Sequence, residues 1–473
     1  MVTIFKHHFP VWSVLEVIAD CVLCFLAVSV AAAQIPGIGL NTGKQLLGLP
    51  HVVLWAVLFS VSMALLYAFV GLYRKAVIRV RLRVLLGRGL VAMTMGSCIA
   101  YLALESLGDG SYAILLFINA VPAMAVAVVA VRSVGHLLRR GAIGARRVLV
   151  VGTGPEALNV AADLAASEHV RHVLVGFYSI TAETGGALPV QEMMSVPVFN
   201  GHMSIDQLAL AHRVDEIIVA VREQRGVGLP MDQLLACRTR GVPVLDLAAF
   251  FERTKGEVPI DSLKASWLVY GHGFVQDTLR TFIKRDFDIV VSLLLLVIAF
   301  PVMVVAAIAI KFDSRGPILY LQQRVGLRGR LFNCPKFRSM RIDAEQDGIA
   351  RWATPGDSRV TRVGAVIRKC RIDELPQLVS VLRGEMSLVG PRPERPAFVE
   401  QLRSEILFYD IRHSVKPGVT GWSQVRYSYG ASVEDARRKH QFDLYYVKNH
   451  SLFLDLLVLV ETVSVVLFRE GSR

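Results

Sequence analysis

The chain has 473 residues, 53% of them apolar, and its mean hydropathy of +0.48 is high for a soluble globular enzyme. Its length predicts roughly two or three domains. The 52 Lys and Arg residues outnumber the 39 Asp and Glu residues, which gives a formal charge of +13. Because the basic residues lie beside apolar runs, this charge indicates a cytoplasmic membrane face and argues against a nucleic-acid-binding protein.

Residues 1–135 contain four apolar stretches, each about long enough to cross a hydrocarbon core of ~30 Å. These stretches are Val11–Ala33, His51–Leu72, Val84–Leu104 and Tyr112–Val131. The loops after the second and fourth stretches are rich in arginine, and the other two loops are not. By the positive-inside rule, we expect a transmembrane bundle with both ends in the cytoplasm. Glu16 and Asp20 share one helix face near the cytoplasmic end, where we expect a structural or interfacial role.

Residues 145–250 alternate between strand and helix patterns, which predicts a parallel, Rossmann-like sheet. The expected strands are Val148–Val151, Val173–Phe177, Glu216–Val221 and Val242–Leu245. The segment 152–157 (GTGPEA) matches a GxGxxA turn, which can hold a phosphate at a helix N-terminus. The acidic residue that would hold a ribose is missing near the end of the second strand, where Phe177-Tyr178-Ser179 stands. The domain is therefore either a degenerate nucleotide fold with a regulatory or scaffolding role, or a dinucleotide site.

A basic, polar connector, residues 251–284, precedes the apolar stretch Ile289–Ile310, which Pro301 interrupts. Its length permits a membrane crossing, which would carry all later residues to the periplasm. A proline removes one internal hydrogen bond and kinks a helix, so the segment can instead dip into one leaflet and return. With basic residues on both flanks, we favour a re-entrant helix at about 286–311, although hydropathy alone does not choose it.

Two later segments have less specific patterns. The last apolar stretch, Leu452–Phe468, contains Asp455 and Glu461, which makes a membrane crossing costly. We expect this helix to lie on the membrane surface or to pack within the C-terminal domain. The segment Lys416–Trp422 combines glycine and proline, which predicts a rigid turn, with packing alone as the alternative reason for these residues.

Residues 336–392 concentrate basic side chains around two adjacent carboxylates, Asp373 and Glu374. Guanidinium forks match phosphate oxygens, so this cluster suits a site for several phosphates and a divalent metal. Neighbouring side chains on a helix diverge by about 100°, which predicts separate roles: one carboxylate attacks phosphorus and the other ligates Mg²⁺. Pro376 indicates a helix that begins after the pair. The alternative is an inert acidic pair at a helix N-terminus.

From Arg285 onward, the chain resembles the bacterial polyprenyl-phosphate hexose-1-phosphate transferases, the large monotopic sugar transferases that initiate exopolysaccharide and O-antigen synthesis. Four ordered motifs carry the resemblance: KFRSM at 336–340, IDELPQL at 372–378, GEMSLVGPRPE at 384–394 and KPGVTGWSQV at 416–425. The N-terminal helices, the α/β domain and the connector look like those of the long family members. The implied fold is an α-helical membrane bundle, an α/β Rossmann-like cytoplasmic domain and a mostly α-helical monotopic catalytic domain, residues 285–473, with a re-entrant membrane helix.

The resemblance also implies roles for particular residues. Asp373 would be the nucleophile that forms a covalent phospho-sugar and expels UMP, and Glu374 would be associated with Mg²⁺. The kink of the re-entrant helix would correspond to Pro301. Small departures from the family pattern, at Ala365-Val366-Ile367 and Cys370, place fine specificity in doubt. The basic residues expected to bind substrate or phosphate are Lys336, Arg338, Arg368, Arg371 and Arg392.

The activity that the resemblance implies is transfer of hexose-1-phosphate from UDP-glucose or UDP-galactose to undecaprenyl phosphate. It would take place at the cytoplasmic face of the bacterial inner membrane, and the sequence does not identify the sugar. Expected partners also include membrane lipids, a second copy of the chain and downstream glycosyltransferases, but no nucleic acid. Two other classes remain as alternatives: an NAD-dependent sugar-modifying enzyme that uses Gly152 and Gly154, and a non-enzymatic scaffold or regulator of polysaccharide assembly.

Overall fold

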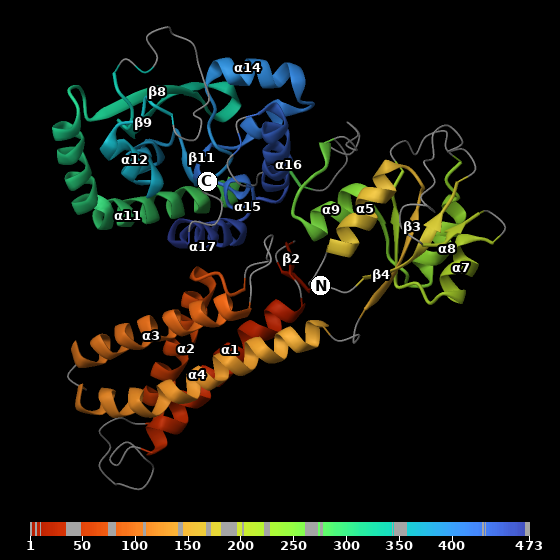
Figure 1. Cartoon of the computed structure of the whole chain (residues 1–473), viewed down its shortest axis with the longest axis horizontal. Helices are drawn as coiled ribbons and strands as arrows, with labels where there is room; N and C mark the ends of the chain where they lie inside the picture. Colours follow the sequence, from red (N-terminus) through yellow and green to blue (C-terminus); the bar gives the residue numbers. More distant parts are fainter. Residues whose placement is uncertain are drawn as a thin grey trace. The chain divides into compact units, whose positions relative to one another are not determined.

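The computed structural model of the chain contains two units, Met1–Ile4 with His8–Thr254, and Phe5–His7 with Lys255–Arg473. Figure 1 labels the helices and strands of both units. The arginine-rich loop at 74–81 and the connector residues 261–272 lie outside the described residues. The structure describes residues 2–4, 7–9, 11–34, 49–73, 82–106, 110–140, 145–166, 172–180, 196–200, 203–221, 228–260, 273–274, 278–342, 344, 357–427, 430 and 432–468.

Two short strands, β1 (Val2–Ile4) and β2 (His7–Phe9), pair with each other and precede the helical bundle of the first unit. The helices α1 and α3 each contact both α2 and α4. Three of them, together with the later helix α11, are long and apolar enough to cross a membrane by length and composition, and α2 is apolar over Val53–Phe69. The predicted apolar bundle is therefore present. Its helices are α1 (Val11–Gln34), α2 (Leu49–Phe69), α3 (Leu82–Ser106) and α4 (Gly110–Arg140).

A buried ionic network ties this bundle together. Arg132 on α4 donates to Glu16 at 3.1 Å and to Asp20 at 2.5 Å, and Tyr73 donates to Asp20 at 2.6 Å. The structural role expected for the two carboxylates is confirmed. The fourth apolar stretch was predicted to end at Val131, which is wrong because α4 continues to Arg140 and so includes Arg132. A buried pair of this kind destabilises the fold strongly when one partner is removed.

The rest of the first unit is the predicted parallel α/β sheet, with strand order β5-β4-β3-β6-β7. Alternate residues of each strand point to opposite faces. Val148 and Val150 pack on one face with α5 and α9, while Leu149 and Val151 pack on the other face with α7 and α8. The strands are β3 (Arg146–Val151), β4 (His172–Tyr178), β5 (Val198–Phe199), β6 (Glu216–Val219) and β7 (Val244–Asp246). The helices are α5 (Pro155–Ala166), α7 (Ile205–Ala211), α8 (Met231–Thr239) and α9 (Leu247–Thr254).

The second unit is mostly helical around a large apolar core, with a smaller apolar cluster formed by Ala306, Ile310, Phe337 and Ile367. An antiparallel hairpin, β8 (Leu319–Val325) and β9 (Leu331–Phe337), follows the long helix α11 (Thr278–Asp313). The 3-10 turns are η2 (Leu327–Gly329), η3 (Ile372–Glu374) and η4 (Tyr409–Ser414), and the remaining strands are β10 (Ser387–Val389) and β11 (Gly418–Thr420). The remaining helices are α12 (Arg362–Lys369), α13 (Gln377–Arg383), α14 (Pro396–Glu405), α15 (Trp422–Arg426), α16 (Val433–Asn449) and α17 (Leu452–Phe468).

The rigid turn predicted at Lys416–Trp422 is wrong, because strand β11 lies inside it and pairs in parallel with β10. The glycines make this close pairing possible. A Cβ atom added to Gly418 would lie 2.1 Å from the backbone nitrogen of Gly390, and one added to Gly421 would lie 2.2 Å from the carbonyl oxygen of Gly390. The glycines were recognised in the sequence as structurally important, but the pairing of β11 with β10 that requires them was not predicted.

The last helix, α17, packs within this unit, which confirms one of the two predicted placements. Asp455 is buried and accepts hydrogen bonds from Tyr446 at 2.7 Å and from Lys284 at 3.0 Å. Glu461 is also buried, and Arg426 donates to it at 2.6 Å. Each carboxylate thus has a basic partner inside the unit, which offsets part of the cost of burying its charge.

The described end of the connector is part of the same core. Val258 and Ile260 are buried in it, and the Val258 amide donates to the Gln441 carbonyl at 3.0 Å. The carbonyl of Gly256 accepts from the indole of Trp422 at 2.7 Å. The second unit therefore includes the chain from Lys255 onward. The sequence had led us to expect this domain to begin only at Arg285, after the connector.

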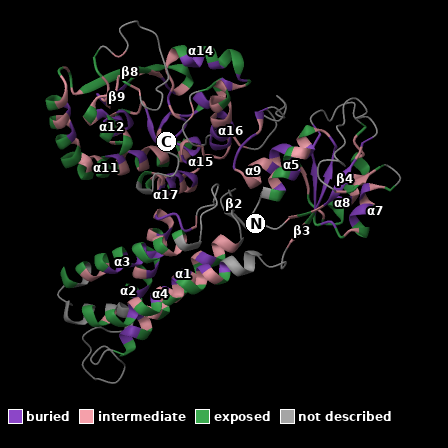
Figure 2. Ribbon diagram, viewed as in Figure 1, coloured by how far each residue is buried: buried purple, intermediate pink, exposed green. Residues whose placement is uncertain are grey.

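Helix α11 bends partway along its length (Figure 1), and Pro301 is the proline inside it. The helix begins earlier than predicted, at Thr278. Both of its ends are anchored to the second unit: Arg285 donates to two carbonyls of α13, and Asp313 accepts from the Val363 amide of α12 at 3.1 Å. Between the ends, the surface is apolar and exposed, with Val297 and neighbouring side chains more than half accessible (Figure 2).

Candidate active site

Three segments of the second unit bring the predicted site residues together. Asp373 and Glu374 lie on η3, Lys336 lies on β9, and Arg392 lies in the segment after β10. Arg371 caps η3 in the left-handed conformation, with φ of 58°, which a residue other than glycine adopts at a cost of about 1 kcal/mol or more. Helix α13 begins just after Pro376, as the sequence predicted.

Glu374 is surrounded by cations. Arg392 donates to its Oε1 atom at 2.7 Å, Lys336 donates to the same atom at 3.4 Å, and Arg371 lies 3.6 Å from Oε2. Burial on its own raises the pKa of this carboxyl, but the three basic groups outweigh it and hold the pKa well below its ordinary value. Glu374 is therefore a fixed anion at neutral pH.

Asp373 is in a different state, although it is the next residue. It is buried, and among the described residues its carboxylate makes neither a hydrogen bond nor an ion pair. Burial, followed by repulsion from Glu374, raises the pKa of Asp373 to about 6. The two carboxylates are therefore chemically distinct: one is held by cations, and the other is desolvated and without a described partner. A desolvated carboxylate is the more nucleophilic of the two.

The remaining predicted basic residues lie in different places. Arg338 is buried and its guanidinium donates to the carbonyls of Ser314 and Arg315, both at 2.7 Å, so it ties β9 to the end of α11. Arg368 lies in the last turn of α12 and contributes to the electrostatic field on Asp357. Arg371 is 45% exposed, which leaves its guanidinium accessible to an approaching ligand.

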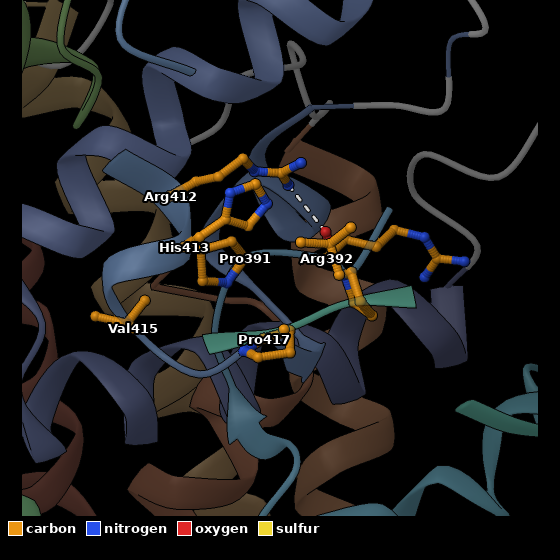
Figure 3. A pocket seen from close by; sticks show the side chains of 9 residues that line it. Pro391, Arg392, Arg412, His413, Val415 and Pro417 are labelled. Atoms are coloured by element: carbon orange, nitrogen blue, oxygen red, sulfur yellow. Dashed lines mark hydrogen bonds between the residues drawn. The ribbon is translucent and has the colours of Figure 1, made fainter. Parts of the chain in front are cut away.

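Sequence analysis missed two arginines that hold the segment carrying Arg392. Arg412 on η4 and Arg324 on β8 both donate to backbone carbonyls of this segment. The Pro-Arg-Pro sequence could have indicated such residues. Its two prolines have no N–H group to donate, so the backbone carbonyls of the segment must find donors elsewhere in the chain. A small pocket lies beside it (Figure 3), lined by Val325, Gly326, Pro391, Arg392, Pro393, Arg412, His413, Val415 and Pro417.

Among the described residues, the acidic pair Asp373 and Glu374 is the candidate donor set for a metal ion. Within the described part of the chain, no group of three or more His, Cys, Asp or Glu side chains could hold a metal. Mg²⁺ commonly binds through one or two carboxylates, with substrate phosphates and water completing its six ligands. Asp373 and Glu374 fit that mode, because Asp373 offers carboxylate oxygens without a described protein partner.

The first glycine of the GxGxxA turn, Gly152, is required by the fold of the α/β sheet. Gly152 has φ of +121°, and a Cβ atom there would lie 2.7 Å from the carbonyl oxygen of Ala220. Beside the second glycine, a carboxylate oxygen of Glu156 lies 3.5 Å from the position of a Cβ atom on Gly154. That carboxylate at the start of α5 disfavours a bound phosphate by charge repulsion.

Comparison with known proteins shows the family of the chain. Residues 279–469 match the family described as bacterial sugar transferase. The chain is 33% identical over 368 residues to a UDP-galactose-lipid carrier transferase of Erwinia amylovora, with 72% of each chain covered. The chain belongs to the bacterial sugar transferase family.

Two further relatives match over shorter stretches. A UDP-N-acetylgalactosamine-undecaprenyl-phosphate N-acetylgalactosaminephosphotransferase of Aeromonas hydrophila is 43% identical over 263 residues, which cover 56% of this chain and 61% of that protein. A UDP-glucose:undecaprenyl-phosphate glucose-1-phosphate transferase of Escherichia coli strain K12 is 42% identical over 183 residues, which cover 38% of this chain and 39% of that protein. The chain thus spans less than two thirds of these two relatives.

Proposed function

We propose that the chain transfers a sugar-1-phosphate from a UDP-sugar to undecaprenyl phosphate and releases UMP. The observation that carries the proposal is the different state of two adjacent carboxylates: Glu374 is fixed by cations, and Asp373 is desolvated beside them. The three cations exceed the charge of the two carboxylates by one. They therefore leave a positive field that suits a diphosphate.

In the first proposed step, a carboxylate oxygen of Asp373 attacks the β-phosphorus of the UDP-sugar. A bond forms between that oxygen and phosphorus, and the bond from phosphorus to the bridging oxygen breaks, so that UMP leaves with the electron pair. Arg392 and Lys336 act electrostatically on Asp373, and in this step they would stabilise the negative charge that develops on the leaving phosphate. The product is an aspartyl phospho-sugar.

In the second step, a phosphate oxygen of the lipid attacks the same phosphorus and displaces the Asp373 carboxylate. This regenerates the enzyme and gives a polyprenyl diphospho-sugar, the first lipid-linked intermediate of an exopolysaccharide or O-antigen. We also propose a bound Mg²⁺, held by Glu374 or by both carboxylates. When bound, it would neutralise phosphate charge as a Lewis acid.

The lipid substrate requires the active site to lie at a membrane surface. We propose that α11 is a re-entrant helix, with its bend in one leaflet and both ends at the cytoplasmic face. The anchoring of both ends to the same unit supports this topology, as does the exposed apolar surface between them. A straight helix of 36 residues would be about 54 Å long, well above the ~30 Å of a hydrocarbon core.

Labelling of single cysteines tests this topology. In a background without native cysteines, Leu279→Cys and Phe312→Cys place a thiol at each end of α11, where the native side chains are 64% and 87% exposed. We expect both thiols to react with an impermeant maleimide in inverted vesicles and to be protected in right-side-out vesicles. Opposite protection of the two ends would mean that α11 crosses the membrane, and the re-entrant helix would be abandoned.

A panel of donors tests the activity itself. Purified full-length protein with undecaprenyl phosphate is given UDP-glucose, UDP-galactose or UDP-N-acetylgalactosamine, with Mg²⁺ or with a chelator. We expect UMP release and a lipid-linked product with at least one of these donors, and loss of both on chelation. Absence of UMP with every donor would favour the scaffold alternative. Activity that survives chelation would contradict the metal proposal alone.

A further inference from the structure

The segment Gly390–Glu394 carries Arg392 to Glu374, but it has almost no regular structure of its own. It contains Pro391 and Pro393, whose nitrogens cannot donate hydrogen bonds. Each of its four carbonyls from 391 to 394 nevertheless has a donor from elsewhere in the unit. The donors are the Gly418 amide to Pro391 at 3.0 Å, Arg412 to Arg392 at 2.9 Å, Arg324 to Pro393 at 2.9 Å and the Val325 amide to Glu394 at 3.0 Å.

Arg412 is the more firmly held of the two arginine donors. Its side chain is 6% exposed, and its Nη2 atom donates to the Arg392 carbonyl (Figure 3) and to Asp443, the latter at 2.8 Å. Its Nη1 atom donates to the hydroxyl of Tyr409 at 2.6 Å, and the guanidinium lies over the same ring. Asp443 and Tyr409 therefore fix the guanidinium, which in turn fixes the carbonyl of Arg392.

The need for this support follows from the Arg392 side chain. That side chain is 30% exposed and is held to Glu374 through one nitrogen. A long side chain with a mobile backbone would lose up to about 2 kcal/mol of rotamer entropy in that contact. An immobile backbone limits the positions that the guanidinium can reach and keeps it near the acidic pair.

We propose that Arg412, with Arg324 beside it, is a positioning residue: it fixes the backbone of Arg392 so that the Arg392 guanidinium stays on Glu374. The catalytic consequence rests on the proposed function, but the immobilisation of the segment does not. Arg412 acts through Arg392 and touches neither Asp373 nor Glu374 among the contacts of the described residues.

The test compares Arg412→Lys with Arg426→Lys in the full-length protein. Lysine keeps the charge beside Asp443 and loses the fork that reaches three acceptors. Arg426 is the matched control, since it is 7% exposed, is paired with Glu461 at 2.6 Å and lies over the Trp422 ring at 4.2 Å, two partners that lie outside residues 390–394. Hydrogen exchange of the peptide that contains residues 390–394 is measured for both variants.

We expect Arg412→Lys to speed exchange in that peptide at least several-fold, and Arg426→Lys to leave it unchanged. Unchanged exchange in Arg412→Lys would overturn the proposal, whether or not the protein transfers sugar. If Arg412→Lys does not fold, Arg324→Lys is measured in the same way against the same control.

Kinetics then show whether the immobilised segment matters for catalysis. We expect Arg412→Lys to lower kcat about tenfold with little change in KM for the donor, because a small misplacement near reacting groups slows chemistry strongly. In an Arg392→Gln background, the same change should have less than a twofold further effect. Additive losses in the double variant would overturn the claim that Arg412 acts through Arg392. A wild-type protein that releases no UMP would instead contradict the proposed function and leave the exchange result standing.

Discussion

Replacement of Asp373 by asparagine is expected to abolish sugar-phosphate transfer and to leave the protein folded. The amide has nearly the shape of the carboxylate but no anionic oxygen to attack phosphorus, so we expect a loss of at least ~10³-fold in kcat. The fold should tolerate the change. Asp373 makes no hydrogen bond or ion pair among the described residues, and burial raises its pKa to about 6.

The sign of the stability effect follows from that raised pKa. A carboxyl whose pKa is higher in the folded state than in the unfolded state is destabilising once pH rises above both values, because the charged form is less favourable when buried. At neutral pH, Asp373→Asn should therefore leave the free energy of unfolding unchanged or raise it by about 1 kcal/mol. If Asp373→Asn loses activity because it no longer folds, the result would not support a nucleophilic role for Asp373.

Two measurements accompany this variant. UMP release reports the first step, and mass spectrometry of the wild-type protein incubated with donor alone should show one added phospho-sugar on the peptide that contains Asp373. Asp410→Asn is the matched control, because Asp410 is 54% exposed and pairs with Arg403 in the same unit. Normal turnover by Asp373→Asn would contradict the covalent mechanism, since no other described carboxylate adjoins Glu374.

The elements with strong local patterns were predictable from the sequence. The apolar lengths of the bundle and the alternation of the α/β sheet led to the right classes of structure. For the sheet, four predicted strands overlap β3, β4, β6 and β7, and only the two-residue β5 was missed. The acidic pair and the basic residues around it were also found, because arginine and lysine are concentrated in one stretch of the sequence, residues 336–392. The helices and strands depend on residues that are close in sequence, whereas the site was found from its composition, since Lys336 and Glu374 lie 38 positions apart.

The features that were missed depend on contacts distant in sequence. Strand β11 is defined only by its pairing with β10, about 30 residues earlier in the chain. The difference between Arg338 and Arg392 has the same origin. Both are arginines in basic motifs, but the fold places Arg338 on the carbonyls that end α11 and Arg392 on Glu374. Nothing in the local sequence separates an arginine that donates to backbone carbonyls from one that donates to the acidic pair.

Replacement of Arg392 by glutamine is expected to lower kcat/KM for the UDP-sugar by about 10² to 10³, the usual cost of removing one strong donor to developing charge. Glutamine removes the 2.7 Å contact to Glu374 and leaves that buried carboxylate with Lys336 at 3.4 Å and the half-exposed Arg371 at 3.6 Å. Arg392→Lys restores the charge without the planar fork, so we expect it to recover part of the loss.

The two variants separate two explanations for the importance of Arg392. If its charge alone matters, lysine should restore nearly full activity; if the geometry of the fork matters, Arg392→Lys should stay at least about tenfold below wild type. Arg395→Gln is the control, because Arg395 lies three residues further on and its guanidinium lies over the Phe398 ring at 5.8 Å. Its steady-state kinetics should match wild type. A wild-type value of kcat/KM in Arg392→Gln would show that Arg392 has no role in the reaction. The four donors that hold its segment would then have no catalytic purpose.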